Sequence, residues 1–211
     1  MEKKKITIIG AGMMGSALAF PAAENGHEVH IVGTCLDDKI IDGYLATGKH
    51  EKFCRPFPEN VNYHYFKDWK TVVEGSDFVI GGVSSFGVDW FLEEILIQLD
   101  PEMPVLSVTK GLRATDDGSL LSYPGYWMSE LAKRGIHRDI CAVGGPCTSY
   151  ELVFKDPTEV AFCGWDNEVL RMMKQAMQRP YYHISLTNDV IGLESAVALK
   201  NAYAMAVTLA V

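Results

Sequence analysis

The stretch KITIIGAGMMGSALAFPAAENG, residues 5–26, decides the fold. It opens with a short β-branched apolar run, typical of a strand buried on both faces, and closes with a segment of helix-forming composition. Between them, Gly10, Gly12 and Gly15 have the spacing G-x-G-x-x-G. In a dinucleotide-binding unit these glycines make a tight turn, admit a pyrophosphate and let the helix pack on the strand. The helix N-terminus then offers free N–H groups to the phosphates.

The surroundings of the glycine motif favour cofactor binding over a structural glycine turn. HEVHIV, residues 27–32, supplies a second strand at the expected distance. A signal peptide is disfavoured because the glycines interrupt the apolar region. Met13 and Met14 fill the middle of the motif and are candidate cofactor contacts. Pro21 predicts a kink or break of the first helix near Phe20.

The end of the second strand normally shows which cofactor is bound, through an acid for NAD or an arginine for NADP. Neither stands at the turn of VGTCLDDKII, residues 32–41. Thr34, followed three residues later by Asp37, predicts a capping-box variant at the start of the next helix. The Thr34 side chain suits a ribose hydroxyl or a phosphate, so the sequence leaves NAD and NADP both open.

The rest of the chain alternates strands with helices, which predicts an α/β fold with a doubly wound, Rossmann-type parallel sheet. A helix interrupted near Pro124 and Gly125 is expected in the less regular stretch after Lys110. We expect a dinucleotide-binding domain over 1–187 and the first helix of a second, helical domain over 188–211. The strands are expected within residues 61–66, 77–83, 104–111, 140–147, 157–164 and 181–187.

Ligands of such sheets bind outside the carboxyl ends of the strands, near the switch in strand order. The glycine motif, the segment with Ser84 and Phe86, and Lys110 all follow predicted strands. They are therefore candidates for one site. Phe86 suits the wall of a nicotinamide pocket, and packing in the core is an equal alternative.

The last segment, ALKNAYAMAVTLAV, residues 198–211, places Lys200 and Asn201 in an apolar, alanine-rich run. A snorkelling surface lysine is one interpretation. A more specific interpretation is that the Lys200 ammonium points into a cleft, where it polarises a carbonyl group of a ligand and exchanges a proton with it. A membrane span is disfavoured because both polar residues would lie near its middle.

Composition limits the classes of partner. A net charge of −8 argues against a nucleic-acid binder, which needs a basic surface. The five cysteines are odd in number and scattered without a C-x-x-C pair, so neither a disulfide framework nor a metal site is predicted. A reducing, cytoplasmic location fits this cysteine usage best.

GAGMMGSALA, SVTKGL, GGPCTSYEL and DVIGLESAVALKNAYAMAV occur in the order of the motifs of the NAD(P)-dependent sn-glycerol-3-phosphate dehydrogenases, which the whole chain resembles. The resemblance implies that Lys200 is the catalytic lysine. It makes Lys110 a second catalytic lysine, in contact with both substrate and cofactor. Asn201 would bind substrate, and Gly145 and Pro146 would form a turn lining the cleft.

The resemblance also implies NAD or NADP as cofactor and a phosphorylated small molecule, dihydroxyacetone phosphate or sn-glycerol 3-phosphate, as substrate. Glu194 matches an acidic position of the last motif, without a defined role. The chain is expected to be the N-terminal portion of a longer enzyme or a natural truncation, and its last helix is a candidate surface for pairing with a second copy in a homodimer. Met13 and Met14 depart from the usual Ser-Trp of the glycine loop, and GGPCTSY departs from Ser-Gly-Pro-Ser-Phe-Ala. The alternatives are a dehydrogenase of the 6-phosphogluconate or hydroxyacid type and a non-catalytic NAD(P)-binding module.

Overall fold

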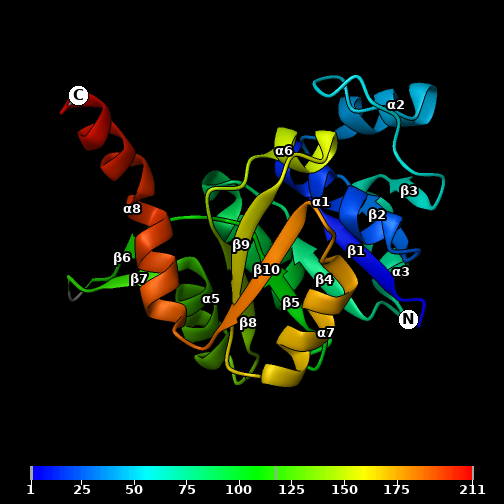
Figure 1. Cartoon of the computed structure of the whole chain (residues 1–211). Helices are drawn as coiled ribbons and strands as arrows, with labels where there is room; N and C mark the ends of the chain where they lie inside the picture. The colour runs from blue at the N-terminus through cyan, green and yellow to red at the C-terminus, as the bar shows by residue number, and fades with distance from the viewer. Residues whose placement is uncertain (1, 117, 211) are drawn as a thin grey trace.

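A computed structural model describes residues 2–116 and 118–210 (Figure 1). In these residues eight strands form one sheet in the order β10-β9-β8-β5-β4-β1-β2-β3. The strands of this sheet are β1 (Lys5–Ile9), β2 (Glu28–Val32), β3 (Val61–His64), β4 (Phe78–Gly81), β5 (Val105–Ser107), β8 (Ile140–Gly144), β9 (Thr158–Cys163) and β10 (Tyr182–Thr187). Two further strands, β6 (Leu112–Ala114) and β7 (Leu120–Ser122), pair in a separate antiparallel hairpin.

Helices cover both faces of the sheet. One hydrophobic core contains Leu18 of α1, Leu152 of α6 and Leu170 of α7, and the other contains Phe91 of α4 and Trp127 of α5. The helical elements are α1 (Met13–Glu24), α2 (Asp38–Thr47), η1 (Phe66–Asp68), α3 (Trp69–Val73), η2 (Ser85–Gly87), α4 (Val88–Phe91), η3 (Leu92–Leu96), α5 (Tyr123–Ala132), α6 (Ser149–Phe154), α7 (Asn167–Met177) and α8 (Val190–Leu209).

The first strand shows why these segments form buried strands. Ile6 and Ile8 belong to one core and Ile9 to the other, and all three are fully buried. The one polar side chain between them, Thr7, shares a hydrogen bond with Ser76 at 2.8 Å between the two hydroxyl oxygens. A strand that is buried on both faces has a nearly continuous apolar sequence, and β1 has such a sequence.

The predicted doubly wound sheet is confirmed, with one difference. The sheet is parallel from β3 to β8, but β9 runs antiparallel to β8, with Ala142 opposite Cys163. β10 is parallel to β9 and so shares its reversed direction. The connection from β8 to β9 contains only the short helix α6. It does not bring the chain back to the end of the sheet at which β8 begins. The neighbouring strand therefore runs the opposite way, as happens in mixed sheets.

The predicted break of α1 near Phe20 and the predicted interruption near Pro124 are wrong. α1 continues through Pro21 to Glu24, because a proline near the end of a helix gives up only one backbone bond, and the Pro21 carbonyl still accepts from the Asn25 N–H. Pro124 lies in the first turn of α5, where its missing N–H costs nothing, and the Ser122 hydroxyl caps that turn.

α8 begins after Asp189, whose carboxylate accepts a hydrogen bond from the Gly192 N–H. Its first half packs on β8 and touches β7 and β9, and its second half extends away from the body of the molecule (Figure 1). By length and composition, α8 is the one helix among the described residues that could cross a membrane. Docking accounts for the apolar residues of the first half, such as Val190 and Val197, whereas the apolar side chains of the second half are exposed.

Candidate functional site

The switch in strand order lies between β1 and β4. β1 is followed by β2 and β3 on one side, whereas β4 pairs with β1 on its other side. Gly10 has a φ of +112°, and a Cβ there would lie 2.7 Å from the Gly82 carbonyl oxygen. A Cβ at Gly15 would collide with the Gly10 carbonyl. These glycines therefore allow the turn, α1 and the end of β4 to pack closely.

Gly12 differs from its two neighbours in the motif. Its backbone is in an ordinary extended conformation, and the nearest atom to an added Cβ would be the Gly82 carbonyl oxygen at 4.0 Å. Packing therefore does not require a glycine at this position. Open space beside Gly12, at the N-terminus of α1, is what a pyrophosphate needs to approach the backbone.

A groove of about 320 Å³ extends from this loop. Of the predicted cofactor contacts, Gly10, Gly12, Thr34, Ser84 and Phe86 line it. The Phe86 side chain is 98% exposed, so core packing, the alternative for this residue, is wrong. The remaining lining residues are Cys35, Leu36, Asp37, Gly82, Val83, Gly87 and Trp90.

The capping box predicted for Thr34 is wrong in its details. α2 begins at Asp38, and Asp37, not Thr34, is the residue before it. One oxygen of the Asp37 carboxylate accepts three hydrogen bonds, from the Thr34 N–H at 2.8 Å, the Thr34 hydroxyl at 2.9 Å and the Ala11 N–H at 3.1 Å. The Asp37 carboxylate thus joins the turn after β2 to the turn after β1.

A second cavity of about 300 Å³ shares Gly12 and Ser84 with the groove. It brings Met13 and Met14 together with Ser84 and Lys110. The Thr109 hydroxyl donates to the Val83 carbonyl at 2.8 Å and so ties the turn after β5 to the turn after β4. Three strand ends that are far apart in the sequence therefore meet in one place.

Lys110 and Lys200 both lie in this region. The Lys200 ammonium donates to the Gly145 carbonyl at 3.2 Å, and Gly145 and Lys110 line one small cavity with Met14. Burial lowers the pKa of Lys110, and the positive charge of Lys200 lowers it further. A negatively charged ligand placed between two such ammonium groups would relieve their repulsion.

The other predicted site residues are less clearly placed. Asn201 is exposed on α8, and no hydrogen bond of its side chain is observed within the described residues. Pro146 is exposed next to Gly145. Cys147 lines the Lys110 cavity, but burial raises the pKa of its thiol to about 11, so it is neutral near pH 7 and no nucleophile.

Sequence reasoning missed several residues of the groove. Asp37 was assigned to a helix start and as a charge that disfavours the extra phosphate of NADP, without its contact to the glycine loop, and Trp90 and Gly82 of the groove and Thr109 of the neighbouring cavity were not singled out. The pair Gly81-Gly82 directly after a predicted strand was the available signal for Gly82, because adjacent glycines mark close approach of backbones. No comparable local signal exists for Trp90 or Thr109, whose positions depend on the tertiary fold.

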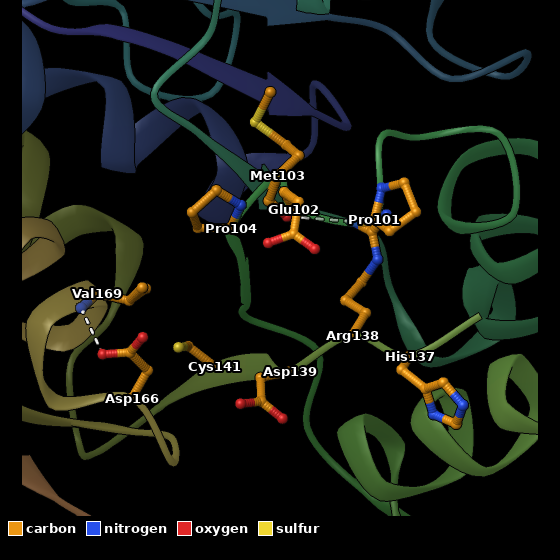
Figure 2. A pocket seen from close by; sticks show the side chains of 10 residues that line it. All are labelled: Pro101, Glu102, Met103, Pro104, His137, Arg138, Asp139, Cys141, Asp166 and Val169. Carbon is orange, nitrogen blue, oxygen red and sulfur yellow. Dashed lines mark hydrogen bonds between the residues drawn. The ribbon is translucent and has the colours of Figure 1, made fainter.

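A cavity of about 360 Å³ lies at the opposite end of the sheet, where β5 and β8 begin (Figure 2). The Arg138 guanidinium donates to the carbonyls of Leu99, Asp100 and Met103 and so holds the loop before β5. Asp166 caps α7, and burial raises the pKa of the Cys141 thiol to about 12. These side chains have structural roles, and the amino ends of strands are not where such sheets bind ligands.

Within residues 2–116 and 118–210 no group of three or more histidine, cysteine, aspartate or glutamate side chains could hold a metal ion.

Comparison with known proteins identifies the family. Residues 5–170 match the family described as "NAD-dependent glycerol-3-phosphate dehydrogenase N-terminus". The NADP(+)-dependent glycerol-3-phosphate dehydrogenase of Archaeoglobus fulgidus is 31% identical over 202 residues, which cover 96% of this chain and 59% of that protein. The chain thus spans less than two thirds of the length of this relative.

Solved structures agree on the fold. A glycerol-3-phosphate dehydrogenase from Coxiella burnetii has a TM-score of 0.80 at 22% identity, over 94% of this chain and 58% of that one. The Plasmodium falciparum enzyme has a TM-score of 0.81 at 22% identity, over 94% and 56%. The glycine loop after β1, the turn after β4 and the family match over residues 5–170 together show that this chain belongs to the NAD-dependent glycerol-3-phosphate dehydrogenase N-terminal family.

Proposed function

We propose that this chain forms the cofactor-binding part, and the two-lysine part of the active site, of an oxidoreductase that interconverts dihydroxyacetone phosphate and sn-glycerol 3-phosphate with NAD or NADP. The observation that carries the proposal is the place of Lys110 in the cavity beside the glycine loop, with the Lys200 ammonium bound to the carbonyl of Gly145, which lines a second cavity with Lys110. Family membership and the names of the relatives support the substrate.

The groove fits an extended dinucleotide. Open space beside Gly12 suits the pyrophosphate, and the free N–H groups at the start of α1 suit its charge. Phe86 and Trp90 offer aromatic walls on one side of the groove, and Thr34 lies at the end expected for the ribose. When bound, the cofactor would supply or accept the hydride.

The lysines would manage the charge of the reacting oxygen. An ammonium at Lys200, held in direction by the Gly145 carbonyl, donates a hydrogen bond to a carbonyl oxygen and gives it a proton as it becomes a hydroxyl. The reverse reaction returns the proton to the amine. Lys110 contributes a second positive charge to a phosphorylated ligand in a protein of net charge −8, where such charge has to be concentrated locally.

The proposal includes either NAD or NADP as the cofactor. The Thr34 hydroxyl donates to Asp37, so its oxygen faces any ribose group as an acceptor, which suits a hydroxyl. The Asp37 carboxylate disfavours an additional phosphate nearby. The relative in A. fulgidus is nevertheless NADP(+)-dependent by name, so both cofactors belong in the test.

The test is the substitution Lys200→Met in the protein that carries this chain, with Lys52→Met on an exposed loop as the matched control. We expect Lys200→Met to lower the turnover of dihydroxyacetone phosphate by at least about 100-fold, because proton transfer contributes that much. The Kd for NADH should stay within about twofold of the unsubstituted value, since Lys200 binds the Gly145 carbonyl and not the glycine loop.

Three outcomes would contradict parts of the proposal. Undiminished turnover in Lys200→Met would remove Lys200 from the chemistry. Preferential turnover of a hydroxyacid without phosphate would favour the alternative dehydrogenase type. Saturable NADH binding without turnover of either substrate would favour a non-catalytic module.

The cytoplasmic location and the homodimer are proposals of the same kind. Exposed apolar side chains of Tyr203, Met205, Val207 and Leu209 on α8 support an association through that helix.

A further inference from the structure

The strands β4 and β5 remain joined beyond the end of their paired residues. Gly81 lies opposite Ser107, and the Val108 N–H then donates to the Gly81 carbonyl at 3.2 Å. Two residues after Gly81, a side chain makes the connection, since the Thr109 hydroxyl donates to the Val83 carbonyl at 2.8 Å. Thr109 and Val83 are both buried. Loss of this hydroxyl would leave a buried carbonyl without its donor, which is costly.

The backbone of Thr109 is fixed as well as its side chain. The Thr109 N–H donates to the hydroxyl oxygen of Ser107 at 3.2 Å, and Ser107 is fully buried. Lys110 is the next residue, and it lines the cavity of about 300 Å³ together with Thr109. A lysine side chain is long and flexible, so the range of its ammonium depends on where its backbone is held. Thr109 provides that fixed point.

The turn after β4 is held by bonds that do not involve Thr109. The Gly82 N–H donates to the Ile9 carbonyl at 2.8 Å, and the Gly87 N–H donates to the Ser84 carbonyl at 2.9 Å. This turn lines both the groove and the cavity. The Thr109 hydroxyl therefore attaches the turn after β5 to a turn that is already fixed on the cofactor side.

We propose that Thr109 is a positioning residue that sets the place of Lys110 relative to the turn after β4, through the hydrogen bond of its hydroxyl to the Val83 carbonyl. The role of Lys110 toward a phosphorylated ligand rests on the proposed function, whereas the hydrogen bond itself does not. A ligand that contacts both the cofactor and Lys110 needs the two at a fixed separation, because a displacement of about 1 Å can cost about 100-fold in rate.

The first test is the steady-state reduction of dihydroxyacetone phosphate by the protein that carries this chain. Thr109→Val removes the hydroxyl and keeps the shape of the side chain, whereas Thr109→Ser keeps the hydroxyl. We expect Thr109→Val to raise the KM for dihydroxyacetone phosphate by about tenfold and Thr109→Ser to change it by less than about threefold. The Kd for NADH should change by less than about threefold in both variants, since the bonds of Gly82 and Gly87 hold the cofactor side.

Thr7→Val is the matched control for a general loss of stability. Its hydroxyl is fully buried and shares a hydrogen bond with Ser76 at 2.8 Å, and Thr7 is outside the residues that line the groove and the cavity. Thr7→Val should therefore be destabilised in urea to an extent similar to Thr109→Val, with an unchanged KM. A raised KM in Thr7→Val as well, or an unchanged KM in Thr109→Val, would overturn the proposal. An equally raised KM in Thr109→Ser would also overturn it, because the hydroxyl would not be responsible.

The second test needs neither cofactor nor substrate. Amide hydrogen exchange, followed by NMR, reports local opening of the turn after β5. The Val108 and Thr109 amides should exchange at least about tenfold faster in Thr109→Val and at the original rate in Thr109→Ser, with the amides of β1 as the internal reference. Unchanged exchange in Thr109→Val would overturn the attachment. If the unsubstituted protein did not reduce dihydroxyacetone phosphate, the proposed function would fail, and the exchange rates would still decide whether Thr109 holds this turn.

Discussion

The Asp37 carboxylate accepts a hydrogen bond from the backbone N–H of Ala11 at 3.1 Å. The same oxygen accepts from the N–H and the hydroxyl of Thr34, so one side chain joins the turn after β1 to the turn after β2. Both turns line the groove. The shape of the groove therefore depends on the hydrogen bonds that the Asp37 side chain accepts from Ala11 and Thr34.

Asp37→Ala should loosen the glycine loop. Removal of an acceptor that serves three donors is expected to lower the free energy of unfolding by about 1–3 kcal/mol and the affinity for NADH by about tenfold or more. Urea denaturation and a fluorescence titration measure the two effects. Asp38→Ala, which changes the exposed neighbouring carboxylate, is the control and should alter neither by much. An Asp37→Ala chain as stable and as tight-binding as the original would show that the brace is unimportant.

Gly15→Ala should be strongly destabilising, because the new Cβ would collide with the Gly10 carbonyl. Overpacking against backbone is expected to cost about 3 kcal/mol or more in free energy of unfolding. Gly43→Ala is a matched control, since Gly43 lies within α2 with nothing within 4 Å of an added Cβ. That change should be neutral or stabilise by up to about 1 kcal/mol. Equal stabilities of the two variants, measured in urea, would refute the close packing described for the loop.

Cys35 provides a built-in reporter of the groove. It is exposed and lines the groove, Cys54 is exposed outside it, and the other three cysteines are buried. With NADH or NADPH at about ten times its Kd, alkylation of Cys35 by N-ethylmaleimide should slow by about tenfold, whereas Cys54 should be little affected. Mass spectrometry of both peptides in one sample gives the ratio. Equal rates for Cys35 with and without cofactor would place the cofactor elsewhere.

Glu194 should make stability depend on pH. Its pKa is raised from 4.5 to about 7 in the folded chain, so the folded state holds the proton more tightly than the unfolded state. The burial penalty is therefore absent below about pH 4.5 and complete above about pH 7. Relative to the unsubstituted chain, Glu194→Gln should gain about 3 kcal/mol in free energy of unfolding between pH 4.5 and pH 8. A difference that is the same at both pH values in urea titrations would mean that Glu194 does not titrate in this range.

The sequence was sufficient to predict the strands, the glycine loop and the two-sided sheet, because each of these is encoded by local composition. β1 is recognisable since Ile6, Ile8 and Ile9 are all buried, and the motif glycines have fixed spacing. The reversed direction of β9 could not be predicted in this way, since an apolar run does not specify its orientation. The β6–β7 hairpin was missed for a related reason, as its six paired residues are too few to show a period of two.

The site was predicted in outline for the same physical reason. Lys110 was recognised because it follows a strand, and Lys200 because it interrupts an apolar run. The contact of the Asp37 carboxylate with the glycine loop gave no such signal, since the backbone N–H of Ala11 that donates to it lies 26 residues away. Contacts of this kind are set by tertiary packing, and a single sequence does not reveal them.

The most direct test of the account is a titration of the folded chain with NADH and NADPH, followed by energy transfer from tryptophan, with Gly12→Ala beside it. Trp90 lines the groove and should report binding. Gly12→Ala should fold normally, because the nearest atom to the added Cβ would be 4.0 Å away, yet bind at least about tenfold more weakly, because the methyl group would fill the approach to the pyrophosphate. Saturable binding that Gly12→Ala weakens is the predicted result. A folded chain that binds neither cofactor, or a Gly12→Ala variant that binds as tightly, would contradict the dinucleotide site.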